Sequence, residues 1–137
     1  MKILETENVI FTITEERIFH FFVKDFCSIT YDDAIQVTAE IETYYLKNNL
    51  TKVGMNLVEF GHAATADQAT REYASTKKAN TRSNGSAILV KNFAQQLIGD
   101  YYLKFNHPRY PTKVFYKKEK ALAWIRETLA KYDNENK

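Results

Sequence analysis

The sequence predicts an α/β fold: a mixed, four- to five-stranded sheet that opens with an antiparallel hairpin, plus about four helices. Two β-branched and aromatic segments, residues 8–13 and 18–23, are separated only by a short polar link, which is typical of a hairpin. Later apolar segments alternate with stretches of helical periodicity, which favours parallel strands joined by crossovers. The predicted order is β-β-α-β-α-β-α-β-α.

The strands are expected where short apolar segments lie between polar turns. The second one, residues 18–23, is apolar on both faces except at His20, so we expect it to be covered on both sides. Residues 80–86 are polar and contain an Asn-Gly pair, which predicts a loop. The later strands are residues 52–60, 87–90 and 112–116.

Three of the helices are expected to begin at a capping pair, in which a side-chain oxygen accepts a hydrogen bond from a free amide. The helix from Thr65 to about residue 78 has few large apolar side chains, so it should cover the sheet thinly. The capping pairs are Thr30 with Asp33, Thr65 with Gln68, and Asn92 with Gln95.

Two helices carry an apolar stripe at helical spacing. In the helix that follows Asn92, the stripe consists of Phe93, Leu97, Tyr101 and Phe105. In the last helix, the inner face is expected to consist of Ala121, Leu122, Ile125 and Leu129.

The length of 137 residues fits a single domain, with residues 1–7 and 133–137 expected to be frayed. Hydrophobic residues make up 45% of the chain, which supports a real core. The net charge of +2 is small for a protein that binds nucleic acid without specificity, so no specific nucleic-acid partner is expected.

The chain is expected to be cytoplasmic. No apolar segment approaches the roughly 18 residues that span a bilayer, and the first residues lack the apolar core of a signal peptide. Cys27 is the only cysteine, which excludes an intramolecular disulfide and is compatible with a reducing compartment. Because Phe26 and Ile29 are close to it in the sequence, we expect Cys27 to be buried and inert.

The order of elements resembles the STAS-like superfamily, in particular the SpoIIAA-like branch of small bacterial proteins related in fold to the lipid-binding SEC14 domain. The resemblance spans Val9 to Leu129. It depends on the paired opening strands, the break at Gly61 before a capped helix, and the closing strand with its helix, residues 121–125.

That resemblance implies a regulatory or partner-binding module, some relatives of which are thought to bind small apolar or anionic ligands. The anti-sigma-factor antagonists of the superfamily carry an Asp-Ser phosphorylation motif at the start of the helix after the third strand. The corresponding stretch here, residues 61–65, reads Gly-His-Ala-Ala-Thr and contains no Asp-Ser pair. Only Thr65 could take the place of the phosphorylated serine.

No catalytic, metal or cofactor motif is found. His20, His62 and His107 lie far apart without a second ligand at helical or turn spacing, whereas a zinc site needs three or four converging ligands. We interpret His20 as a core residue and His107 as a loop residue fixed beside Pro108. Phosphate loops, nucleophile elbows and dinucleotide fingerprints are absent from the sequence, so we expect neither an enzyme nor a bound cofactor.

The strongest candidate site lies at the carboxyl ends of two predicted strands. In open α/β sheets ligands bind outside the carboxyl ends of strands, and helix N-termini there offer free amides. The competing interpretation is that Thr65 and Asn92 simply cap helices. The candidate residues are Glu59, Gly61, His62, Thr65, Lys91 and Asn92.

A second candidate is a group of aromatic side chains near the C-terminal third of the chain. We expect these rings to pack in the core and at the sheet edge, although they could instead line a ligand groove. If several are exposed together, a partner or dimer interface becomes the better interpretation. The group consists of Tyr101, Tyr102, Phe105, Tyr110, Phe115 and Tyr116.

Three functional hypotheses follow. The first is a non-enzymatic regulatory or protein-interaction module, the second a carrier or sensor for a small apolar or anionic, lipid-like ligand, and the third an enzyme of unrecognised type. A flat exposed apolar patch would favour the first, an aromatic-lined cavity the second, and converging titratable groups the third. The sequence leaves open the identity of the partner or ligand, the pathway, and whether the chain forms a homodimer.

Overall fold

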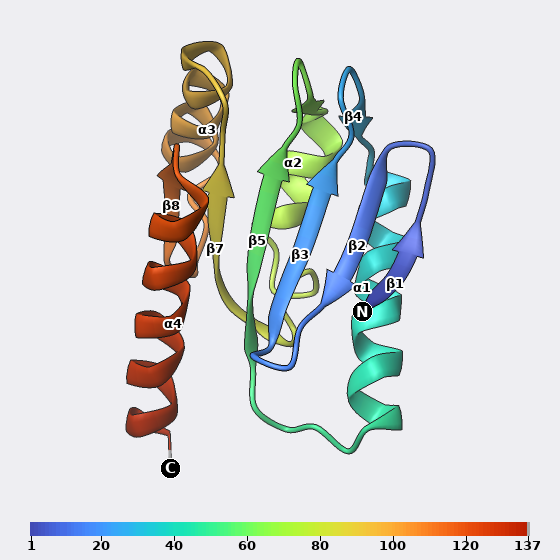
Figure 1. Cartoon of the computed structure of the whole chain (residues 1–137), viewed down its shortest axis with the longest axis vertical. Coiled ribbons are helices and arrows are strands. Elements are labelled where there is room, and N and C mark those ends of the chain that lie inside the picture. The colour runs from blue at the N-terminus through green and yellow to red at the C-terminus, as the bar shows by residue number, and fades with distance from the viewer. Residues whose placement is uncertain (137) are drawn as a thin grey trace.

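The structure, a computed structural model, describes residues 1–136 as eight strands and four helices (Figure 1). The strands are β1 (Lys2–Glu5), β2 (Val9–Ile13), β3 (Ile18–Val23), β4 (Ser28–Ile29), β5 (Gly54–Phe60), β6 (Thr65–Ala66), β7 (Ser83–Leu89) and β8 (Thr112–Phe115). The helices are α1 (Tyr31–Lys47), α2 (Gln68–Ala74), α3 (Phe93–Phe105) and α4 (Lys118–Glu135).

Six of the strands form one sheet in the order β1-β2-β3-β5-β7-β8. Strand β2 pairs antiparallel with β1 and β3, and the pairs β3–β5, β5–β7 and β7–β8 are parallel. The mixed α/β fold with an opening hairpin is therefore confirmed. The sheet is wider than expected because residues 2–5, which were expected to be frayed, pair with β2. At the C-terminal end of the chain, where fraying was also expected, α4 continues to Glu135.

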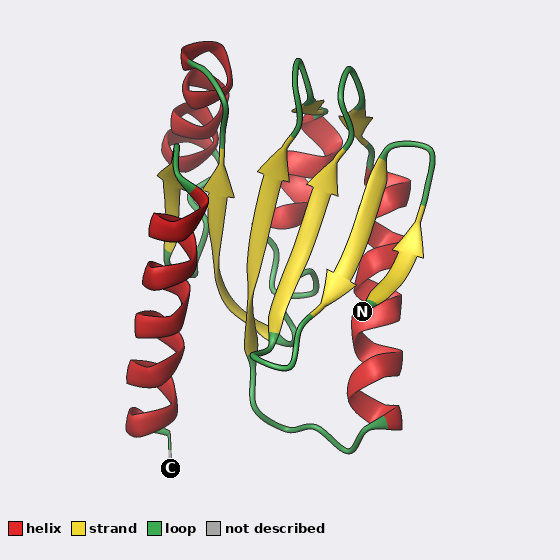
Figure 2. Ribbon diagram, viewed as in Figure 1, coloured by secondary structure: helices red, strands yellow, loops and turns green. Residues whose placement is uncertain are grey.

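Helices α1, α2 and α3 cover one face of the sheet, and α4 alone packs on the other (Figure 2). Under α1, the core contains Phe11 and Phe19. On the opposite face, Ile125 and Leu129 of α4 pack with Leu57 and other apolar residues of β5 and β7, which confirms the predicted inner face of the last helix. Among the described residues, no helix is long and apolar enough to cross a membrane.

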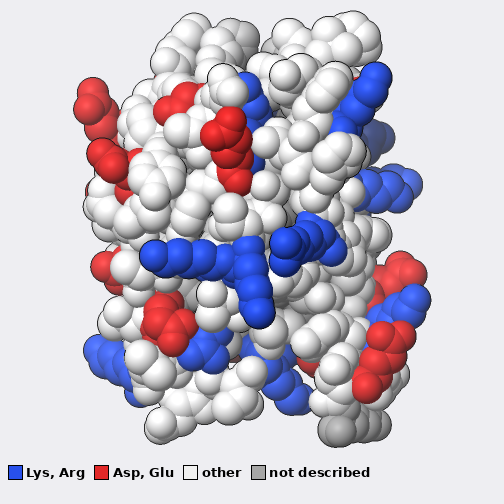
Figure 3. Space-filling view, turned by 180° about the vertical axis from the view of Figure 1, so that it is seen from behind, with Lys and Arg blue, Asp and Glu red and all other residues white. Residues whose placement is uncertain are grey.

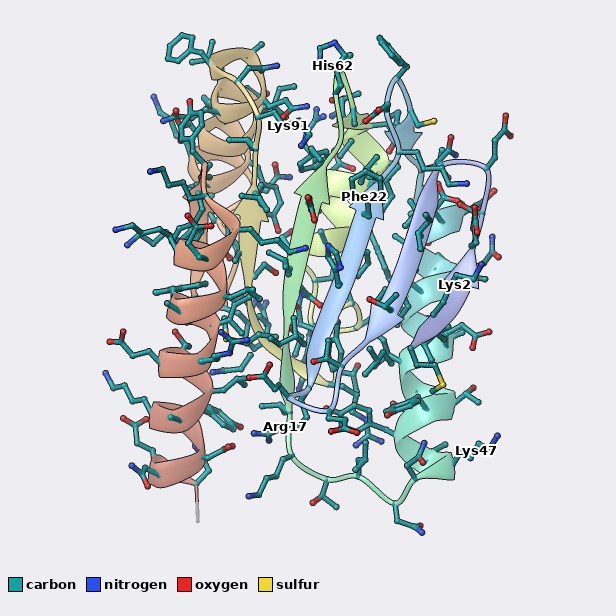
Figure 4. All side chains as sticks on the ribbon, viewed as in Figure 1. Lys2, Arg17, Phe22, Lys47, His62 and Lys91 are labelled. Atoms are coloured by element: carbon teal, nitrogen blue, oxygen red, sulfur yellow. The ribbon has the colours of Figure 1, made fainter. Side chains whose placement is uncertain are left out.

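Strand β3 is covered on both sides only at its start, where Ile18 is buried with Ile125 and Leu129 of α4, so the expectation of full cover was wrong for the rest of the strand. Helix α4 packs mainly on β5, β7 and β8, so β1, β2 and the later residues of β3 carry no helix on that face (Figure 1). His20 and Phe22 point to this open face and are half-buried (Figure 4 labels Phe22). Strand hydrophobicity alone did not reveal which side a helix would cover.

Two of the three predicted capping pairs are confirmed. Thr30 and Asp33 form a reciprocal capping box, and the Asn92 side chain accepts from the amide of Gln95 at 2.9 Å. Thr65, in contrast, does not cap α2. It lies in the short strand β6, and Asp67 caps the helix by accepting from the Thr70 amide at 2.8 Å.

Strand β7 begins four residues earlier than predicted, because the Asn-Gly pair lies within the strand. Gly85 has a φ of 145°, a conformation that side-chain-bearing residues rarely adopt, and an added Cβ would lie 2.3 Å from the carbonyl oxygen of Pro111. Glycine inside a strand often marks a close backbone approach of this kind. The expected loop over residues 80–86 is thus replaced from Ser83 onward by a strand.

Candidate functional site

The carboxyl ends of β5 and β7 lie at one edge of the sheet, as predicted from their parallel pairing. His62 and Lys91 are both exposed at this edge (Figure 4). Of the other predicted residues, Glu59 lies on the face of the sheet that α4 covers, Gly61 is buried, Thr65 lies in β6 and Asn92 caps α3, so the six residues do not converge on one point.

Glu59 belongs to the face covered by α4, not to the edge. Its carboxylate oxygen Oε1 lies 2.8 Å from Nε2 of His20 and 3.6 Å from Nζ of Lys118. The hydrogen bond from His20 lowers the pKa of Glu59 below its usual value, aided by the charge of Lys118 and opposed by burial. Glu59 therefore joins β3, β5 and the start of α4 through an ion pair.

This pair predicts a dependence of stability on pH. Because the folded-state pKa of Glu59 is lowered, its carboxylate stabilises the fold above the unfolded value of about 4.5, and this contribution is lost as the pH falls below that value. We expect Glu59→Gln to cost roughly 0.5–1 kcal/mol at pH 6.5 and to lose less stability than the wild type between pH 5.5 and 3.5.

Urea denaturation of both proteins across this pH range measures the effect. Glu127→Gln, which changes an exposed carboxylate on the outer side of α4, is the control and should follow the wild-type curve. Parallel pH curves for Glu59→Gln and the wild type would contradict the role of the ion pair.

Gly61 has a structural role at the edge. Its amide donates to the carbonyl of Val23 at 2.8 Å, and an added Cβ would lie 2.4 Å from Oδ1 of Asp25. The chain needs a glycine here because the neighbouring loop passes so closely.

Two backbone donors at this edge are already occupied by side chains of the protein. The amide of His62 donates to Oδ1 of Asp25 at 2.7 Å, and the amide of Lys91 donates to Oε1 of Gln95 at 2.8 Å. The side chains of His62 and Lys91 are exposed there. That this edge binds a partner or ligand stays a prediction.

The loop before β4 presents a phenylalanine that sequence reasoning treated as part of a buried cluster. Phe26 is exposed, has a φ of 60° and packs edge-on against the ring of His62, with ring centroids 5.3 Å apart. Cys27 is half-buried, so the expectation of a buried thiol was wrong. The turn that exposes Phe26 also brings Cys27 toward the surface.

The predicted apolar stripe of α3 faces solvent. The exposed fractions of Phe93, Leu97, Tyr101 and Phe105 are 67%, 52%, 53% and 56%. The opposite face packs inward: the Gln95 side chain donates to the carbonyls of Gly61 and Ala64 at 2.9 and 3.1 Å, and Gly99 allows contact with Val114. The expectation that Tyr101 and Phe105 pack in the core or at the sheet edge was therefore wrong.

The aromatic group does not form a common groove. Tyr102 is buried in the core beneath α3, whereas the rings of Tyr101 and Phe105 pack on each other outside, with centroids 4.4 Å apart. Tyr110 and Phe115 are half-buried, and Tyr116 is exposed. The exposed members extend the apolar surface of α3 toward β8.

A cavity of about 120 Å³ lies between the sheet and helices α1, α2 and α3. Apolar side chains of all these elements line it, together with a few polar ones. In the sequence, the only indication of this cavity was the prediction that α2 covers the sheet thinly. Representative lining residues are Phe21, Val58, Ile41, Tyr73, Ile98 and Tyr102.

Charge is distributed unevenly around these surfaces. Seen from behind, acidic side chains gather over α1, whereas white and blue side chains predominate at the upper right, over α3 (Figure 3).

Within residues 1–136, no group of three or more His, Cys, Asp and Glu residues could hold a metal ion.

Comparison with solved structures identifies a protein of the same fold. The crystal structure of an uncharacterized protein from the DUF3478 family of Shewanella loihica PV-4, described as having a SpoIIAA-like fold, superposes with a TM-score of 0.59. The match covers 89% of this chain and 97% of the other, at 15% sequence identity, and confirms the SpoIIAA-like fold that the element order predicted. None of the curated proteins matches. A family model matches residues 11–129, most of the chain, and the protein therefore belongs to the family described as Domain of unknown function (DUF7793).

Proposed function

We propose that this protein is a non-enzymatic interaction module with a regulatory role, and that the outer face of α3 is its binding surface. The observation that carries the proposal is the exposed stripe of Phe93, Leu97, Tyr101 and Phe105, hereafter the α3 stripe. Contiguous exposed apolar surface of this kind marks interaction sites in globular proteins, and aromatic side chains are enriched there.

The spacing of the α3 stripe favours a second copy of the chain as the partner. Its four residues recur at every fourth position along the helix, with a phenylalanine at each end, so the apolar positions are evenly spaced about the centre of the stripe. Two copies packed antiparallel would place Phe93 opposite Phe105 and Leu97 opposite Tyr101. Such self-complementarity is what a two-fold symmetric interface requires.

Sedimentation velocity over a range of protein concentrations tests this proposal. The wild type is expected to dimerise, and Leu97→Asp, which places a carboxylate at the centre of the α3 stripe, is expected to weaken the dimer at least tenfold while the monomer stays folded. Leu46→Asp is the matched control, because Leu46 is likewise an exposed leucine, near the end of α1. Its dimerisation should equal that of the wild type.

A wild type that stays monomeric at high concentration would overturn the proposal of a homodimer. An equal loss of dimer in Leu97→Asp and Leu46→Asp would place the interface elsewhere. In that case the edge formed by His62 and Lys91 is the next surface to test. We likewise infer a cytoplasmic location, with which the single cysteine is compatible.

A further inference from the structure

The cavity beneath α2 exists because small side chains surround it where a close-packed interior would have large ones. Ala64, Ala66, Ala74 and Ala79 all line it. As a result, Val58 in the central strand β5 is only half-buried, although α2 and α3 lie over that face. Well-packed interiors contain few voids larger than a water molecule, so an apolar space of this size favours a ligand site.

The size of the cavity limits what it could hold. An engineered cavity of about 150 Å³ in another protein, lined by Leu, Ile and Phe, takes up benzene. The cavity here measures about 120 Å³ and is lined mainly by apolar and aromatic groups. It therefore suits an apolar group of about the size of one aromatic ring.

Arg71 supplies the single positive charge among the lining residues. Its guanidinium donates to the carbonyl of Ala66, and within residues 1–136 it forms no salt bridge with a carboxylate. Since a guanidinium has five N–H donors in a planar fork, most of them remain for another acceptor. Carboxylates match that fork with two parallel hydrogen bonds.

We propose that the cavity binds a small amphipathic anion, with a ring-sized apolar body inside and a carboxylate on Arg71. Access is available along α2, because Arg71 is half-buried while Ala74, another lining residue, is exposed. The segment after α2 is held in place by Asn80, whose side chain donates to the carbonyls of Ala74 and Thr76 at 2.9 and 2.7 Å. The mouth of the cavity is thus formed by a short helix and a fixed turn.

Binding of benzoate and of neutral benzyl alcohol, followed by protein-detected NMR titration, tests the proposal. Wild type is expected to bind benzoate saturably, with shifts confined to residues around the cavity, and at least tenfold more tightly than benzyl alcohol. Arg71→Met keeps the apolar stem and removes the charge, so it should remove this preference and leave benzyl alcohol binding unchanged.

A second variant tests the cavity itself. Val58→Phe should fill the space and abolish binding of both compounds, while its circular dichroism and melting temperature report whether it folds. Leu97→Asp, which changes only the α3 stripe, should bind benzoate like the wild type, so the two proposals fail separately. If the folded wild type binds neither compound saturably, the cavity is not a ligand site. If it binds both with equal affinity and Arg71→Met leaves these affinities unchanged, Arg71 does not bind a carboxylate.

Discussion

Replacing Ile125 with alanine is expected to destabilise the protein by about 2–5 kcal/mol. Ile125 is fully buried at the centre of the contact between α4 and the sheet, where it packs with Leu57, Ala87 and Leu129. Removing its side chain loses apolar burial and leaves a space that the surrounding strands cannot fill completely. No other helix covers this face, so these contacts with the sheet are the apolar packing that holds α4 in place.

Urea denaturation monitored by circular dichroism measures this loss, with an unchanged m-value showing that the transition still involves the whole domain. Leu129→Ala, one turn further along the same face, should give a loss in the same range. Leu46→Ala is the control, because that leucine is exposed on α1, and it should change stability by less than about 0.5 kcal/mol. A loss this small for Ile125→Ala would show that another face of α4 contacts the sheet.

Replacing Gly61 with alanine is expected to cost about 1–3 kcal/mol or more. The new Cβ would lie 2.4 Å from Oδ1 of Asp25 and 2.8 Å from the carbonyl oxygen of Val23. Rotating the Asp25 side chain could relieve the first contact, but the second involves backbone and requires β3 and β5 to separate. The hydrogen bond from the Gly61 amide to Val23 would weaken at the same time.

Gly99→Ala is the matched control for this substitution. Its Cβ would lie 3.0 Å from a methyl group of Val114, a side chain that can move, and alanine is favoured over glycine within a helix. We expect Gly99→Ala to change the free energy of unfolding, measured in urea, by much less than Gly61→Ala. Equal losses would show that the edge loop adapts to a side chain as readily as the helix does.

The parts of the fold that could be predicted were those with a strong local signal. The opening hairpin and the caps at Thr30 and Asn92 depend on neighbouring residues, so sequence pattern was sufficient for them. Strands β4 and β6 are two residues long each and carry no periodicity. Their pairing is decided by loops that the packing of α1 and α2 brings together.

The orientation of α3 could not be predicted because the helix is apolar on two faces. One face holds the α3 stripe, and the other holds Ile98, Gly99 and Tyr102. Periodicity identifies both stripes but does not show which one meets the sheet. Because Gly99 has no side chain, the helix backbone can approach Val114 of β8 closely on the inward face.

The candidate site was predictable in position and less so in detail. The rule for carboxyl ends of parallel strands located His62 and Lys91 at one edge. The direction of Glu59 was readable from strand alternation, since Met55 and Leu57 on the same face pack toward α4. The cavity had no comparable signal, because it results from small side chains contributed by several distant segments.

The two ends of the main sheet bear on how this chain behaves at high concentration. Strands β1 and β8 are only four residues long each, and the pairing of β1 is irregular between Lys2 and Leu4. Lys113 is exposed on β8, and Pro111 directly precedes that strand. Short edge strands with lysines, irregular pairing and a proline resist addition of a strand from another molecule. Growth into fibrils by edge-to-edge pairing is therefore disfavoured, and contacts between copies are directed to side-chain surfaces.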